Sequence, residues 1–250
     1  MLKNYVQEAS SGLFPTMNGY GLATSIFDPF TKKFIEFSKS LTEEGHVLEI
    51  GAAYGAVSQN ILAENDEVSL TINDMEPKHL SIFLKNLKTF RPGITVKAGI
   101  FPEQLDFKEN SFDAILMARM LQYVAPKKLP EVVKKIHFWL KPNGKIYVVC
   151  KTPYIQLLSD FIPIYESRKA CGKDFPGLIN GLKSKVHQKA NFDHIPDFIN
   201  VFDPDVLLKL FNQAGFKIDA CEFINRFDFP TDIALSGKEE VGLIATKLTL

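Results

Sequence analysis

The sequence predicts an α/β fold with a seven-stranded, mostly parallel sheet that is covered by helices on both faces. Three observations predict it. Apolar runs of strand length alternate with amphipathic stretches of helix length along most of the chain. Two of the apolar runs, residues 115–117 and 146–149, are continuous, as in parallel strands that are buried on both faces. The 250 residues, 46% of them hydrophobic, suffice for one large core.

The alternation begins with a helix that Asp28 is suited to cap and that Gly45 ends. In a later helix, Leu80, Phe83 and Leu87 share one apolar face. The strands expected for the parallel part of the sheet are residues 46–50, 68–73, 94–98, 112–117 and 145–150. The helices expected between these strands are residues 57–63, 78–90 and 126–140.

The alternation stops in residues 152–201. A stretch of this length without structure is uncommon inside a compact domain, so we expect an inserted helical lid over the carboxyl edge of the sheet. After the insert, Asp203 caps another helix, and residues 216–224 and 241–247 suit an antiparallel hairpin at one edge. The expected organisation is a helical cover (1–45), a core (46–151 and 202–250) and the lid (152–201).

The composition argues against several classes of function. Lysine plus arginine and aspartate plus glutamate number 29 each, so no basic surface for nucleic acid is expected. Cys150, Cys171 and Cys221 have neither disulfide nor metal-site spacing, which predicts reduced thiols and no metal. No apolar run reaches the roughly 18 residues of a membrane span, and the N-terminus lacks a signal-peptide core. We therefore expect a cytoplasmic location; the oligomeric state stays open.

The most informative segment is residues 47–55, Val-Leu-Glu-Ile-Gly-Ala-Ala-Tyr-Gly. It combines a buried strand with a turn in which Gly51 and Gly55 allow tight backbone geometry, followed by a helix. Glu49 precedes the first glycine by two residues. A carboxylate there suits a ligand with nearby positive charge and repels a diphosphate. This favours S-adenosylmethionine, with its sulfonium and ammonium groups, over a nicotinamide dinucleotide.

Four segments together resemble the class I S-adenosylmethionine-dependent methyltransferases, and most closely the small-molecule enzymes of the quinone-biosynthesis type. The four segments are residues 47–55, 71–77, 110–118 and 140–149. The resemblance covers roughly residues 46–150 and 202–248. It implies a Rossmann-like fold, S-adenosylmethionine as cofactor with S-adenosylhomocysteine as product, and methyl transfer to a small-molecule or lipid-like acceptor.

The resemblance also implies which residues bind the cofactor. Glu49, Gly51, Ala53 and Gly55 would wrap its methionine part, although Ala53 stands where a glycine is usual. Asp74, after the second strand, would accept two hydrogen bonds from the ribose. Capping the next helix is the alternative role for Asp74.

The adenine site departs from the family pattern, because no carboxylate follows the third strand at the expected place. Met75, Ile100 and Phe101 are therefore expected to pack on the adenine, and Glu103 or Asp106 could substitute only with a shifted loop. Two further contacts are expected. Ala118 would lie beside the methyl donor, and Tyr20 would close over the cofactor unless it belongs to a surface turn.

Acceptor binding is expected from Arg119, Gln122 and Tyr123 after the fourth strand, and from Tyr154 in the lid. Solvent-facing positions at a helix start are the alternative for the first three. The catalytic residue is not specified, because methyl transfer can proceed from geometry alone. The candidates for a base are the lid residues His187, His194 and Tyr165.

Three functions remain open from the sequence. The first is methyl transfer from S-adenosylmethionine. The second is a binding or regulatory protein that keeps the fold without transfer, which the missing adenine carboxylate and Ala53 motivate. The third is a nicotinamide oxidoreductase, which residues 51–56 fit loosely and Glu49 disfavours. The acceptor molecule, and whether its methylated atom is O, N or C, are not specified.

Overall fold

The computed structural model describes residues 13–17, 22–87, 92–181 and 197–249. Its centre is a seven-stranded sheet in the order β10-β11-β7-β6-β3-β4-β5. The strands are β3 (His46–Ile50), β4 (Ser69–Asp74), β5 (Ile94–Ala98), β6 (Phe112–Ala118), β7 (Leu140–Lys151), β10 (Phe216–Ile224) and β11 (Glu240–Lys247).

Strands β3 to β7 pair in parallel, and β11 runs antiparallel to both β7 and β10. The predicted seven-stranded, mostly parallel sheet with an antiparallel terminal strand is thus confirmed. The chain starts the sheet at β3, builds β4 and β5 on one side, and then crosses to β6 and β7 on the other. Such a switch point leaves a crevice at the carboxyl ends of the strands, where ligands bind in open α/β sheets.

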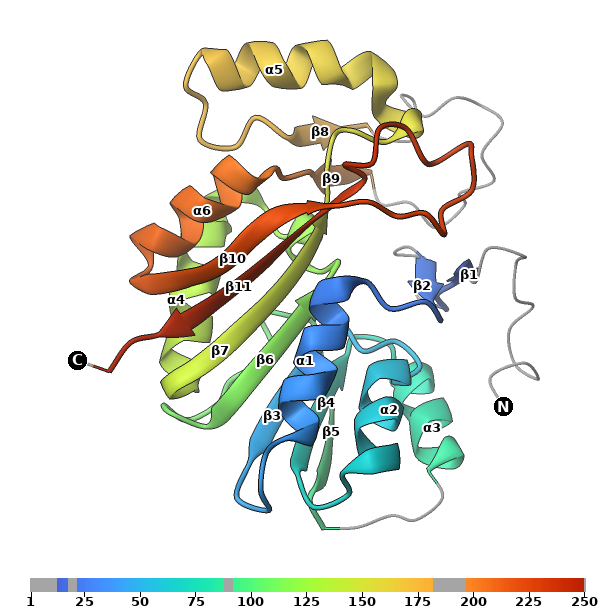
Figure 1. Ribbon diagram of the computed structural model, residues 1–250, viewed down its shortest axis with the longest axis vertical. Coiled ribbons are helices and arrows are strands. Elements are labelled where there is room, and N and C mark those ends of the chain that lie inside the picture. The colour runs from blue at the N-terminus through green and yellow to red at the C-terminus, as the bar shows by residue number, and fades with distance from the viewer. Residues whose placement is uncertain (1–12, 18–21, 88–91, 182–196, 250) are drawn as a thin grey trace.

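Helices cover both faces of the sheet (Figure 1). One face carries α1 (Pro29–Lys39), α2 (Ala56–Glu64) and α3 (Pro77–Asn86); the other carries α4 (Leu129–Trp139) and α6 (Pro204–Gln213). Neighbouring residues of a strand point to opposite faces of the sheet: Val47 packs with α1, α2 and α3, and Leu48 packs with α4 and α6. Asp28 caps α1 as predicted, since its Oδ1 accepts hydrogen bonds from the Phe30 and Thr31 amides.

The region from 126 to 151 differs from expectation in its boundaries. The predicted helix begins as a 3-10 turn, η3 (Pro126–Lys128), before α4. Strand β7 then starts at Leu140, five residues before the predicted start. A register shift against β6 and a positive φ of 63° at Asn143 accommodate the turn-like Lys-Pro-Asn-Gly segment inside this strand. The pattern of turn residues therefore marks a bulge and not the space between two elements.

The N-terminal segment is helical only in part. Strands β1 (Leu13–Pro15) and β2 (Leu22–Thr24) pair antiparallel before α1 begins. In the described residues of the predicted helical cover, 13–17 and 22–45, a small strand pair precedes one helix, so the prediction of helix alone is corrected there.

The insert after β7 is also mixed. It contains η4 (Gln156–Phe161), α5 (Ile162–Ala170) and the antiparallel pair β8 (Leu178–Asn180) and β9 (Phe198–Asn200). The purely helical lid is corrected, because Ile179 and Ile199 face each other across the strand pair and complete the apolar cluster around Tyr165. The insert lies above the carboxyl edge of the sheet (Figure 1). In the described part of the chain, no helix combines the length and apolarity needed to cross a bilayer.

Candidate functional site

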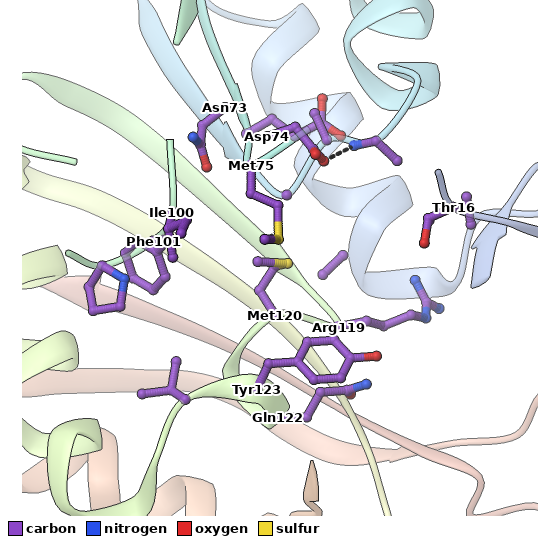
Figure 2. Close-up of a pocket in the computed structure, with 18 of the residues that line it drawn as sticks. Thr16, Asn73, Asp74, Met75, Ile100, Phe101, Arg119, Met120, Gln122 and Tyr123 are labelled. Atoms are coloured by element: carbon purple, nitrogen blue, oxygen red, sulfur yellow. Dashed lines mark hydrogen bonds between the residues drawn. The ribbon is translucent and has the colours of Figure 1, made fainter. Parts of the chain in front are cut away.

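A cavity of about 570 Å³ lies at the carboxyl ends of the parallel strands, at the switch point of the sheet. This volume falls in the usual range for small-molecule sites. Loops after four successive strands of the sheet line it (Figure 2). The predicted site residues found in the lining are Glu49, Gly51, Ala53, Asp74, Met75, Ile100, Phe101, Ala118, Arg119, Gln122 and Tyr123.

The turn after β3 uses left-handed backbone conformations, with φ of 72° at Gly51, 47° at Ala53 and 71° at Gly55. Glycine suits position 51 because other residues rarely adopt this φ; a Cβ there would also lie 2.2 Å from the Sδ atom of Met120 in the observed Met120 rotamer. Ala53 tolerates a conformation that favours glycine because its amide donates a 2.8 Å hydrogen bond to Asp74 Oδ2. The turn is thereby fixed to the end of the neighbouring strand.

Gly55 lies outside the cavity lining. A Cβ at Gly55 would come within 2.3 Å of the Phe83 ring. The missing side chain thus serves the close approach of α2 and α3, and the structure supports a packing role for Gly55 in place of the predicted cofactor contact.

Glu49 presents a buried carboxylate to the cavity, with only 5% of the residue exposed. Its Oε2 accepts hydrogen bonds from the Ser58 hydroxyl and, at 3.2 Å, from the Ser58 amide. Burial raises the pKa of Glu49 to about 7; the Ser58 hydrogen bonds oppose this rise, and the nearby Asp74 charge adds to it. Because a cationic amine would favour the ionised form of Glu49, the carboxylate fits the ammonium end of the expected cofactor.

Asp74, the last residue of β4, is tied to three protein donors. Its Oδ1 accepts from the Glu76 amide at 2.8 Å and from His79 Nδ1 at 3.0 Å, and its Oδ2 accepts from Ala53. His79 Nε2 accepts from the Met17 amide, so its hydrogen is on Nδ1. A carboxylate offers about four acceptor positions, which leaves one for a ligand. Asp74 can therefore accept a hydrogen bond from one ribose hydroxyl without rearrangement, but not the two hydrogen bonds that were predicted.

The alternative role of Asp74 as the cap of the next helix is corrected as well. Glu76 caps α3, through a hydrogen bond that its Oε1 accepts from the Lys78 amide at 3.0 Å. Asp74 holds the start of this segment through the Glu76 amide and, through Ala53, fixes the turn after β3.

The expected adenine side is apolar. Met75, Ile100 and Phe101 line the cavity, and their contact with adenine stays a prediction. Asn73 fixes the loop after β5 by donating to the Lys97 and Gly99 carbonyls at 3.0 and 2.9 Å. Neither carboxylate considered from the sequence replaces the missing one. Glu103 lines the cavity but bonds to Lys128, and Asp106 lies outside the lining. Adenine recognition would therefore depend on packing and backbone groups.

Met120 was not predicted from the sequence and occupies part of the cofactor corner. Its thioether lies against Gly51, and its end points toward Met75 (Figure 2). Methionine has three rotatable side-chain bonds, so a rotamer change can clear the corner.

Arg119, predicted to bind substrate, is held in a buried ion-pair network. Its Nε and Nη2 donate to the two carboxylate oxygens of Glu240 at 2.6 Å, and Nη2 also contacts Asp28 at 3.1 Å. Glu240 accepts a further 2.6 Å bond from Arg226, which pairs with Asp228. Arg119 lines the cavity and also joins β6, β11 and the start of α1; its contact with substrate stays a prediction.

None of the remaining predicted residues is found in the described lining of the cavity. Tyr154 lies outside the cavity lining, and its hydroxyl donates to Glu166 on α5. Tyr165 is fully buried inside the insert and cannot act as a base in the cavity. Tyr20, His187 and His194 lie outside the described residues. Lys151 and Phe198 line the cavity and were missed, although Lys151 ends a strand at the edge where ligands bind.

The sequence matches a protein-family model, and the structure matches several solved structures. The methyltransferase domain family matches residues 47–144. Among solved structures, an S-adenosylmethionine-dependent methyltransferase from Methanosarcina mazei has 19% identity and a TM-score of 0.61, over 87% of this chain and 98% of that chain. The 1,6-didemethyltoxoflavin-N1-methyltransferase of Burkholderia thailandensis was solved with 1,6-didemethyltoxoflavin and S-adenosylhomocysteine. It has 17% identity and a TM-score of 0.59, over 89% of this chain and 80% of that chain.

A third similar structure is a methyltransferase in complex with the Haloferax volcanii Trm112 activator, at 14% identity and a TM-score of 0.60, over 88% of this chain and 90% of that chain. A search of curated proteins gave no significant match. At these identities the structural likeness shows the fold, while the domain match favours a methyltransferase over a nicotinamide oxidoreductase. No group of three potential metal ligands occurs among the residues that the structure describes. Residues 47–144 therefore match the methyltransferase domain family, and the chain has the fold of S-adenosylmethionine-dependent methyltransferases.

Proposed function

We propose that the protein transfers a methyl group from S-adenosylmethionine to a small-molecule or lipid-like acceptor inside the cavity. The observation that carries this proposal is the buried Glu49 carboxylate beside the Gly51 turn, in one cavity with Asp74. Such an anionic corner fits the ammonium end of the cofactor and disfavours a phosphate ligand.

The residues present fit the cofactor part by part. Glu49 and the turn at Gly51 would hold the amino-acid end, Asp74 one ribose hydroxyl, and Met75 with Phe101 the adenine. When bound, S-adenosylmethionine supplies a methyl group made electrophilic by the sulfonium. The chain then has to orient the acceptor in line with that methyl group and to exclude water.

The far wall of the cavity supports a small or lipid-like acceptor. Phe27, Val124, Ala125 and, from the insert, Phe198 are apolar residues of the cavity lining. We infer that residues 152–201 cover the acceptor, because Phe198 brings this segment to the cavity. The balance of 29 basic and 29 acidic residues favours a small acceptor over nucleic acid. The proposed location is the cytoplasm.

A cofactor-binding protein without transfer is the second candidate, and two observations favour it. Met120 lies against Gly51, and Asp74 has three of its acceptor positions filled. Met120→Ala separates the candidates in part. If Met120 blocks a degenerate site, the wild-type protein binds S-adenosylhomocysteine only weakly, and the variant binds it at least tenfold more tightly.

Incubation with S-adenosylmethionine carrying a labelled methyl group, followed by fractionation of a cell extract, tests the first candidate. Label in the small-molecule or lipid fraction supports it. Label confined to protein or nucleic acid contradicts the acceptor class. Binding of S-adenosylhomocysteine with no label in any fraction favours the second candidate, and absence of binding contradicts both.

A further inference from the structure

Lys151 is the last residue of β7 and lines the same cavity as Glu49 and Ala118. In the register of the parallel pair, Ala118 of β6 lies opposite Val149, so Lys151 stands just beyond the end of β6. Its amide donates a 3.1 Å hydrogen bond to Gln122 Oε1. The side chain therefore belongs to the wall formed by the loop after β6, where the acceptor is expected.

The Lys151 amine makes no hydrogen bond or ion pair with any residue in the described part of the chain. The charged groups that face it are Glu240, its cross-strand neighbour on β11, and the guanidinium groups of Arg119 and Arg226. The Glu240 carboxylate is engaged by both arginines. Beyond these groups, the same two arginines pair with Asp28 and Asp228.

These surroundings favour a neutral amine. Burial lowers the pKa of Lys151, and Arg119 and Arg226 lower it further, while Glu240 opposes them. Desolvation beside other cations is a common way to make a lysine basic and nucleophilic near neutral pH.

Gln122 provides a second, independent sign of a ligand. It is fully buried and lines the cavity, and its Oε1 is held by the Lys151 amide. Its Nε2 makes no hydrogen bond of good geometry among the described residues. A polar neighbour is the Tyr123 hydroxyl, whose pKa is raised by burial and lowered only in part by Gln122. A buried amide donor without a satisfied partner costs free energy, which an acceptor oxygen would recover.

We propose, on the basis of the methyl transfer proposed above, that Lys151 is the general base of the acceptor site and that Gln122 donates a hydrogen bond to a second oxygen of the acceptor. The acceptor class that fits is a weakly acidic O–H or N–H group beside a carbonyl or hydroxyl, such as a phenol, an enol or a heterocyclic N–H.

The step balances without a further reactant. The O–H or N–H bond of the acceptor breaks, and its proton passes to the lone pair of Lys151 Nζ. The electron pair left on oxygen or nitrogen forms the new bond to the methyl carbon, while the carbon–sulfur bond breaks and its pair stays on sulfur. Lys151 gains the positive charge that the sulfur loses, and it then releases the proton to solvent.

Competitive labelling of the protein with trace acetic anhydride tests the state of Lys151 directly. Peptide mass spectrometry, repeated from about pH 6 to about pH 11, gives the half-maximal pH of labelling for each lysine. We expect Lys151 to reach half-maximal labelling at least about one pH unit below the lysines on exposed helix faces. Coincidence with those lysines would overturn the proposal. A parallel titration with S-adenosylhomocysteine shows separately whether the proposed function holds.

Variants then test catalysis on a panel of phenols, enols and heterocyclic N–H compounds. Lys151→Met and Lys151→Arg should bind S-adenosylhomocysteine within about threefold of wild type but lose at least about 100-fold in transfer rate, because arginine stays protonated. The matched control is Lys141→Met, on the same strand and paired with Asp113 at 2.7 Å, outside the cavity. Full activity of Lys151→Arg, or wild-type transfer only to acceptors without an ionisable proton, refutes the base.

Discussion

The two walls of the cavity are built in different ways. The cofactor corner, after β3, β4 and β5, is made of backbone: a turn with positive φ at Gly51 and Ala53, fastened to Asp74. The acceptor wall, after β6 and β7, is made of long side chains, with Arg119 bonded to Glu240 and Asp28. The corner holds negative charge that a ligand must neutralise, whereas the ion pairs of the wall neutralise one another.

This difference predicts different responses to mutation. At the wall, charges are already paired, so removing one partner costs stability. At the corner, no cationic side chain of the described residues pairs with Glu49, so removing its charge costs ligand binding and improves stability. Four predictions test this contrast, and they follow in order of decreasing effect.

Glu240→Gln should destabilise the protein most, by about 3–5 kcal/mol, because it removes the buried carboxylate that Arg119 and Arg226 share and leaves only Asp28 and Asp228 to balance them. Urea unfolding measures the loss. The matched control is Asp174→Asn, which removes the exposed ion pair with Lys209 and should cost at most about 1 kcal/mol. Equal losses in the two variants would contradict the structural role of the wall.

Glu49→Gln should stabilise the protein by up to about 3 kcal/mol at pH 8, since each unit of raised pKa corresponds to about 1.4 kcal/mol. The protonated form of Glu49 contributes stability that is fully present below its unfolded pKa of 4.5 and is lost as the pH rises through about 7. Glutamine never loses that contribution. The gain measured by urea unfolding should therefore vanish near pH 4.5. A gain independent of pH would show that its cause is not the charge.

Binding of S-adenosylhomocysteine should weaken as the pH falls below about 7, because the ligand ammonium favours the ionised Glu49 and binding must release its proton. Between pH 8 and pH 6 the affinity should drop by roughly tenfold. Calorimetry in two buffers of different ionisation enthalpy detects the released proton. A flat profile would mean that Glu49 does not face the ammonium.

Ala53→Gly should have the smallest effect, a stabilisation of about 0.5 kcal/mol. Relief of the left-handed conformation, with φ of 47°, slightly exceeds the entropy that glycine adds to the unfolded chain. Asn143→Gly, at φ of 63° in the β7 bulge, is the control and should change stability less, because asparagine tolerates this region. A loss of stability in Ala53→Gly would contradict backbone strain at the turn.

The same contrast explains what the sequence could predict. The sheet and the corner follow from short-range patterns: β5 and β10 were predicted with their observed limits, and the turn at Gly51 lies within one motif. The wall joins Asp28, Arg119 and Glu240, which are 91 and 121 residues apart, and no local pattern signals such a pairing. The sequence therefore indicated the place of Arg119 at the cavity but not its ion pairs. Lys151 was missed because it ends a strand without a motif.

The mixed insert shows the same limit. Strands β8 and β9 have three residues each, too few to show alternation, and their pairing depends on contacts of Ile179 and Ile199 with the cluster around Tyr165. At Asp74 the sequence predicts the position of the residue but not its hydrogen bonds. The sequence indicates a carboxylate at the right place, but its three protein donors come from the folded turn and from His79.

The most direct test of the account is calorimetric titration of S-adenosylhomocysteine into wild-type protein and Glu49→Gln at pH 8. We expect measurable binding to the wild type and an affinity lower by about 10- to 100-fold in the variant, as for the loss of one buried charge-assisted hydrogen bond. Equal affinity in the two proteins, or binding to neither, would contradict it.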